Sequence, residues 1–136
     1  MGSVLNPFHP LARGLVGCWL FNEKGGAQVF DLSGEHHNGT LYGGTVFDPG
    51  GLVFQGTNDW VDLSSLTAFA SGVDHTYFAL VYPQSTASLY QWILNNGDNG
   101  NGTSLIIYSS GGVAYGGCFY QGGKGVLGGL IPISTH

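Results

Sequence analysis

Glycine and other turn-forming residues interrupt this sequence so often that a long amphipathic helix has no room to form. The 136 residues include 25 glycines, whereas glycine averages about 7% of protein sequences. Short apolar runs such as 14–21, 75–82 and 113–120 lie between turn signals, at the spacing of about 8–12 residues that is typical of β-sandwiches and barrels. No helix-length window keeps the i, i+3, i+4, i+7 apolar spacing without a glycine. The sequence therefore predicts an all-β fold, an antiparallel two-sheet β-sandwich.

Charge is scarce and its balance is acidic. Only 8% of the residues are charged, and the three basic ones, Arg13, Lys24 and Lys124, leave a net charge of −5. Three cations cannot form the basic stripe that binds phosphates, so we expect no nucleic-acid partner. No apolar stretch approaches the ~18 residues of a membrane span, so we expect no membrane insertion. The abundant neutral polar residues suit contacts with sugars or with other proteins.

The chain divides into a short arm and one domain. Residues 1–13, broken by Pro7 and Pro10, predict an extended N-terminal arm, and residues 14–136 predict the β-sandwich. The arm lacks the basic and apolar regions of a signal peptide. Cys18 and Cys118 stand 100 positions apart in strand-like runs. A disulfide across the sandwich and two buried free thiols both fit this placement, and the free thiols are the commoner arrangement in a reducing compartment.

Three sequence blocks occur in an order shared with a known family. The first comprises GLVGCWLFNE at 14–23 and DLSGEHHNGTL at 31–41. The second is LVFQGTNDWVDL at 52–63, and the third is HTYFALVYP at 75–83. Together they resemble the entry strand, DxSG loop, FxGxxDYV strand pair and xTxxxWVxP strand of laminin-G-like, concanavalin A-like jelly-roll domains. The segment NPFHPLARGLVG at 6–17 is similar to the start of such domains in bacteriophage virion proteins.

The resemblance also implies C-terminal strands that have no counterpart in this sequence. Family members run on to an acidic strand of the DEVRIY type, whereas this chain passes through a glycine-rich segment and ends at His136. We therefore expect a truncated sandwich with an open edge, and an open edge is a template for pairing with another chain. The expected assembly edge comprises Val126, Leu127, Leu130 and Ile131. Its expected partners are further copies of this chain or other virion proteins.

The loop at 31–38 is the candidate metal site. The resemblance implies a calcium ion bound through Asp31 and Asn38, together with a late acidic residue that has no counterpart here. The alternative is that Asp31 and Ser33 cap the turn through side-chain hydrogen bonds to the backbone. We expect His36 and His37 to be solvated loop residues, because no further zinc ligand can be named beside them.

The aromatic residues fall into two groups. Those in apolar runs are expected in the core: Trp19, Phe21, Phe54, Phe78 and Tyr115. Trp60, Tyr90 and Trp92 instead stand beside polar or loop segments, where a flat ring next to Asn and Asp is suited to stack on a sugar or to contact a partner. Packing between sheets is the alternative role for these three.

Catalysis finds no support in the sequence. The paired carboxylates of a glycosidase are absent, since Glu23 and Glu35 both lie near turns. No nucleophile stands with an identifiable base. We therefore expect a non-enzymatic structural and adhesive module at a virion surface or outside the cell, such as a capsid decoration or tail-associated protein. The alternative is a free-standing carbohydrate-binding module.

Overall fold

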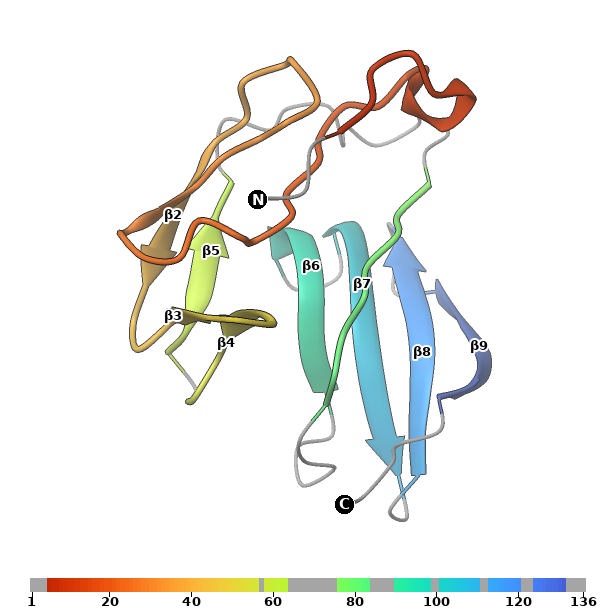
Figure 1. The fold of residues 1–136 in the computed structure, drawn as a ribbon. Coiled ribbons are helices and arrows are strands. Elements are labelled where there is room, and N and C mark those ends of the chain that lie inside the picture. The colour runs from red at the N-terminus through yellow and green to blue at the C-terminus, as the bar shows by residue number, and fades with distance from the viewer. Residues whose placement is uncertain are drawn as a thin grey trace. The chain divides into compact units, whose positions relative to one another are not determined.

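The structure is a computed structural model that describes residues 5–56, 58–63, 76–83, 90–98, 101–110, 113–120 and 124–131 (Figure 1). Every strand pairing in these residues is antiparallel, and the single helical element is the three-residue 3-10 helix η1, Pro10–Ala12. The described part of the chain is therefore all-β, as the glycine-punctuated sequence predicts. Its contacts divide the chain into two compact units, Met1–Ala68 and Phe69–His136.

The described residues of the first unit include five short strands in two sheets. They are β1 (Gln28–Val29), β2 (Gly39–Tyr42), β3 (Val46–Asp48), β4 (Gly51–Val53) and β5 (Trp60–Asp62). β1, β2 and β5 form one sheet in that order, and β3 and β4 form a hairpin. The hairpin turns at Pro49-Gly50, where the Gly50 N–H donates to the Asp48 carboxylate at 2.7 Å.

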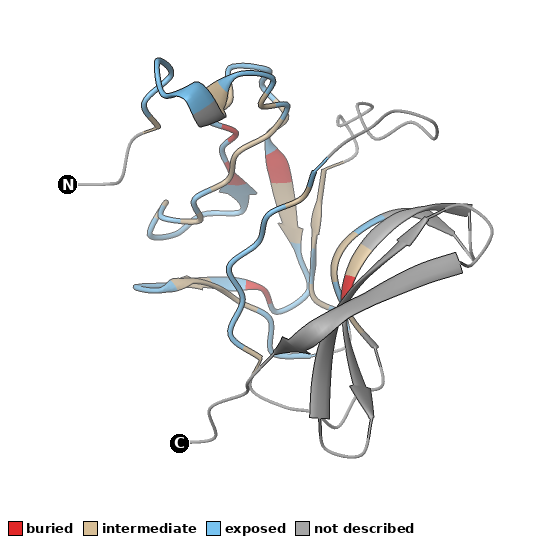
Figure 2. Cartoon of the chain, turned by 90° about the vertical axis from the view of Figure 1, so that its right-hand side faces the viewer, coloured by how far each residue is buried: buried red, intermediate tan, exposed pale blue. Residues whose placement is uncertain are grey.

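One face of the β1–β2–β5 sheet is packed and the other is open. Val29 is fully buried, and Figure 2 marks the buried positions of the described residues in red. A Cβ atom at Gly39 would lie 2.6 to 2.8 Å from side-chain atoms of Leu63, Val61 and Val29. Only glycine therefore fits at this point of the packed face. Because successive side chains of a strand alternate between faces, Thr40 and Tyr42 lie on the opposite face.

Where the second unit is described, its strands form one four-stranded sheet. Its strands, in the order β6–β7–β8–β9, are β6 (Tyr90–Asp98), β7 (Asn101–Ser110), β8 (Val113–Tyr120) and β9 (Lys124–Ile131). The β6–β7 pairing runs to Asp98 and Asn101, so both strands continue through the Asn- and Gly-rich segment 95–102. Ile106 in β7 is fully buried.

Several local expectations are wrong. The apolar run 14–21 lies outside the strands, and so do residues 76–82 of the run expected to form a strand at 75–82. The arm is not uniformly extended, because η1 and hydrogen-bonded turns occupy its second half. The expected core residues Phe54 and Phe78 are 53% and 93% exposed. Phe54 follows the end of β4, which pairs only with β3 in the described residues, and Phe78 lies in the strand-free segment.

Candidate functional site

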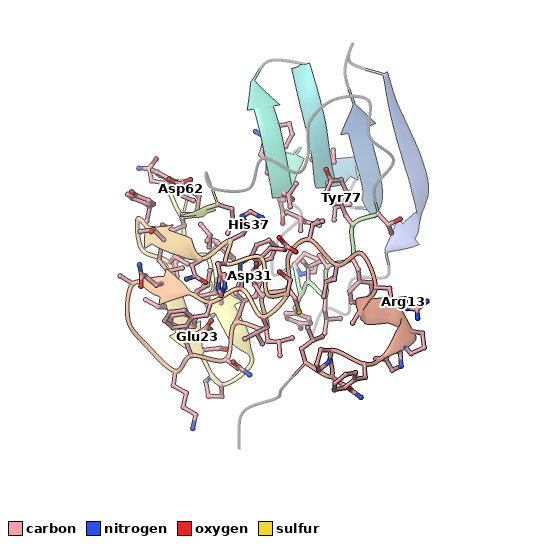
Figure 3. All side chains as sticks on the ribbon, turned by 90° about the horizontal axis from the view of Figure 1, so that it is seen from above. Arg13, Glu23, Asp31, His37, Asp62 and Tyr77 are labelled. Atoms are coloured by element: carbon pink, nitrogen blue, oxygen red, sulfur yellow. The ribbon has the colours of Figure 1, made fainter. Side chains whose placement is uncertain are left out.

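The Asp31 carboxylate is the centre of a hydrogen-bonded cluster in the first unit. The side chain is only 8% exposed. Its Oδ1 atom accepts from the backbone N–H groups of Cys18 at 2.8 Å and Ser33 at 2.9 Å. Its Oδ2 atom accepts from the Ser33 hydroxyl at 2.7 Å and from the His37 N–H at 3.0 Å. Figure 3 shows Asp31 and His37 close together within the unit.

Further hydrogen bonds attach the same loop to the segment before it. The Asn38 Oδ1 atom accepts from the Asp31 N–H at 2.9 Å. The Trp19 indole N–H donates to the His37 carbonyl at 2.8 Å, and the Leu32 N–H donates to the Cys18 carbonyl at 2.8 Å. The loop 31–38 and the segment 18–19 are thus fastened together through both side-chain and backbone groups.

This arrangement changes the acidity of two groups. Burial by itself raises the pKa of Asp31, but the hydrogen bonds from Ser33, Cys18 and His37 outweigh it, so that the pKa lies below its ordinary value. The pKa of the Cys18 thiol is raised, first by burial and then by the negative charge of Asp31. Asp31 therefore stays ionised at neutral pH, while Cys18 stays a protonated thiol. Cys18 is a free cysteine.

The Asp31 cluster does not fit a calcium ion as it is arranged. Calcium takes six to eight oxygen ligands, but both Asp31 oxygens and the Asn38 side-chain oxygen already accept hydrogen bonds from the protein. In the described residues no group of three or more His, Cys, Asp or Glu side chains is placed to hold a metal ion. The geometry is that of the turn cap, the alternative which the sequence left open.

The protonated, partly buried state of Cys18 leads to a measurable prediction. The thiolate is the form that reacts with alkylating reagents, so a raised pKa lowers the reaction rate. We expect iodoacetamide at pH 7.5 to modify Cys18 several-fold more slowly in the native protein than in urea. Mass spectrometry of the tryptic peptide 14–24, which contains Cys18 and not Cys118, measures the rate. Equal rates in the two states would contradict the contacts with Asp31.

A second carboxylate, Asp59, organises the loops at one end of the first unit. Its oxygens accept from the backbone N–H groups of Gly44 at 2.6 Å, Gln55 at 2.5 Å and Gly56 at 2.9 Å. The Gly44 bond is the main cause of the lowered pKa of Asp59, with the other two N–H groups adding to it and burial opposing it. The sequence does not reveal this role, because the donors come from two separate loops.

An exposed aromatic pair lies on the open face of the β1–β2–β5 sheet. Tyr42 of β2 is the register partner of Trp60 in β5. Their rings stack with centroids 5.0 Å apart and an angle of 11° between the planes. Tyr42 is 43% exposed and Trp60 is 51% exposed. The sequence singles out Trp60 but not Tyr42, because only the strand register brings the two rings together.

The other predicted contact residues belong to the second unit. Tyr90 and Trp92 lie in β6, and Trp92 is 58% exposed, while the Tyr90 side chain lies outside the described residues. The predicted edge residues Val126, Leu127, Leu130 and Ile131 all lie in β9. In the described residues β9 pairs with β8 alone and ends the sheet order.

No family model, curated protein or solved structure matches the chain in comparisons with known proteins. Within the described residues, no helix has the length and apolar character needed to cross a bilayer.

Proposed function

We propose that this chain is a non-catalytic structural and adhesive β-sandwich module of the laminin-G-like, concanavalin A-like kind. Its place would be a virion surface or another extracellular assembly, as a capsid decoration or tail-associated protein. The antiparallel all-β architecture supports this family of folds. The resemblance of residues 6–17 to bacteriophage virion proteins supports the location.

The observation that carries the proposal is that β9 lies at the edge of its sheet in the described part of the chain. Its sequence, KGVLGGLI, holds four large apolar residues and one charged residue, Lys124, at its start. An edge strand presents a row of unpaired N–H and C=O groups, and natural proteins commonly block such edges with charges or proline within the strand. β9 carries neither after Lys124. Addition of a strand from another copy of the chain or from another virion protein would complete the sheet.

The state of two described carboxylates, Asp31 and Asp59, supports a role for them other than catalysis. A general base needs a free oxygen within reach of a substrate proton. The oxygens of Asp31 and Asp59 instead accept backbone and hydroxyl hydrogen bonds within the protein. Lowered pKa values make both groups weaker bases than an ordinary aspartate. Both carboxylates thus stabilise loops.

The mass of the purified protein in solution tests the assembly. We expect light scattering to give a multiple of the 14.3 kDa chain mass. Val126→Lys and Leu127→Lys, which place a charge on one or the other face of β9, should each shift the population toward the 14.3 kDa species. Val46→Lys is the matched control, since Val46 is 44% exposed in β3 of the first unit.

Each outcome of this experiment bears on the proposal. A folded wild-type protein that stays at 14.3 kDa over the accessible concentration range would contradict assembly through β9. Equal dissociation by Val46→Lys would also contradict it. The masses should not change with a calcium chelator, because the Asp31 cluster is held by protein donors alone.

The second candidate function is a free-standing carbohydrate-binding module. The exposed Tyr42–Trp60 pair favours it, because an aromatic face that remains accessible is suited to stack on a sugar ring. Such a module would remain a monomer and bind glycans, whereas a virion component would associate with itself or with particles.

A further inference from the structure

The open face of the β1–β2–β5 sheet combines flat apolar surface with neutral and acidic hydrogen-bonding groups. The register pairs Gln28 with Thr40, Thr40 with Asp62, and Tyr42 with Trp60. By strand alternation these five side chains share the face opposite Val29, Val61 and Leu63. Figure 3 shows Asp62 at the margin of the first unit, apart from Asp31.

The aromatic pair remains accessible despite its stacking. Cross-strand stacking covers one face of each ring, and such pairs add to the stability of a sheet. With 43% of Tyr42 and 51% of Trp60 exposed, a substantial part of each ring is still open to solvent.

The polar residues of this face lie close enough to the rings to contact the same bound sugar. Residues two apart on a strand are separated by about 7 Å, and neighbouring strands by about 4.8 Å. Thr40 and Asp62 therefore lie next to the aromatic pair along the same two strands, and Gln28 lies one strand further across. A hydroxyl, a carboxylate and an amide are the groups that hydrogen-bond sugar hydroxyls.

The charge of the face selects among glycans. It carries no Lys or Arg, and its one carboxylate belongs to Asp62. The whole chain has a net charge of −5. A sulfated or carboxylated glycan would meet repulsion without a compensating cation. An uncharged sugar meets no such penalty.

We propose that the open face formed by Gln28, Thr40, Tyr42, Trp60 and Asp62 binds neutral pyranose glycans, with one sugar ring stacked on the aromatic pair. This inference rests on the adhesive part of the proposed function and gives it a location and a ligand class. It does not depend on β9, so assembly and glycan binding are measured separately.

The experiment is titration of the full chain with cellohexaose, maltohexaose and mannohexaose, with a heparin hexasaccharide as the anionic comparison. We expect Trp fluorescence and calorimetry to detect binding of at least one neutral oligosaccharide and none of the heparin fragment. Trp60→Ala and Tyr42→Ala should each weaken binding by about tenfold or more, whereas Tyr42→Phe, which keeps the ring, should weaken it less. Trp92→Ala is the matched control, because Trp92 is exposed in the other unit.

The outcomes separate this inference from the proposed function. Failure of all three neutral oligosaccharides to bind at millimolar concentration would overturn the inference while leaving assembly through β9 untouched. Binding lost in Trp92→Ala and kept in Trp60→Ala would overturn it as well, and so would stronger binding of the heparin fragment. Thermal unfolding of each variant checks that a loss of binding does not reflect a loss of fold, which we do not expect for these exposed rings.

Discussion

Asp31→Ala should be among the most destabilising single substitutions in the first unit, lowering the free energy of unfolding by about 3 kcal/mol or more. The substitution removes a carboxylate that accepts four hydrogen bonds. It also leaves the N–H groups of Cys18 and His37 without their acceptor in a site where Asp31 is only 8% exposed. Urea unfolding followed by Trp fluorescence measures the change, and Trp19 reports directly because its indole N–H bonds to the same loop.

Asp48→Ala is the matched control for Asp31→Ala. Asp48 is exposed and accepts one local hydrogen bond, from the Gly50 N–H. Its loss should therefore cost about 1 kcal/mol or less. Equal effects of the two substitutions would show that the Asp31 cluster does not hold the loop 31–38 to the segment 18–19.

The pH dependence of the Asp31→Ala effect follows from the direction of the pKa change. The folded pKa of Asp31 lies below its value in the unfolded chain, which is about 3.9 for an ordinary aspartate. The ionised group therefore stabilises the fold fully above about pH 4, and this stabilisation is lost as the pH falls through the folded pKa. The difference between wild type and Asp31→Ala should be greatest at neutral pH and should shrink in acid.

The expectations that depend on local chemistry agree best with the structure. β8 spans the predicted run 113–120, because this run lies between turn residues. The turn cap at Asp31 and Ser33 is also local, because the donor and acceptor residues are two positions apart. Alternating patterns and turn residues carry this information within a few positions.

The expectations that fail depend on partners distant in the sequence. The run 14–21 has the apolar composition of a strand, but its Cys18 N–H bonds to a carboxylate 13 positions away and Phe21 adopts a φ of 54° that interrupts an extended chain. The sequence likewise indicates Trp60 as a contact residue but not Tyr42, since Tyr42 stacks on Trp60 only through the β2–β5 register. No composition or periodicity encodes such a register directly.

Gly43→Ala should lower the free energy of unfolding by about 2–4 kcal/mol, through backbone strain and a steric clash together. Gly43 has a φ of +68° in the turn between β2 and β3. A Cβ atom there would collide with the backbone carbonyl of Asn58, with the carbonyl carbon only 2.7 Å away. Since the obstacle is backbone, it cannot move aside as a flexible side chain would. The shift needed would also disturb the adjacent Gly44–Asp59 hydrogen bond.

Two further alanine substitutions separate strain from collision. Gly26 has a φ of +97° with nothing within 4 Å of the added Cβ, so Gly26→Ala carries strain alone and should cost about 1–2 kcal/mol. Gly56→Ala meets neither obstacle and should change stability by less than about 1 kcal/mol in either direction. The denaturation midpoints of the three variants show which substitution lowers the stability most. If Gly43→Ala costs no more than Gly26→Ala, then the chain at residues 58–59 does not approach the β2–β3 turn closely. The Asp59 hydrogen bonds would then not hold these loops together.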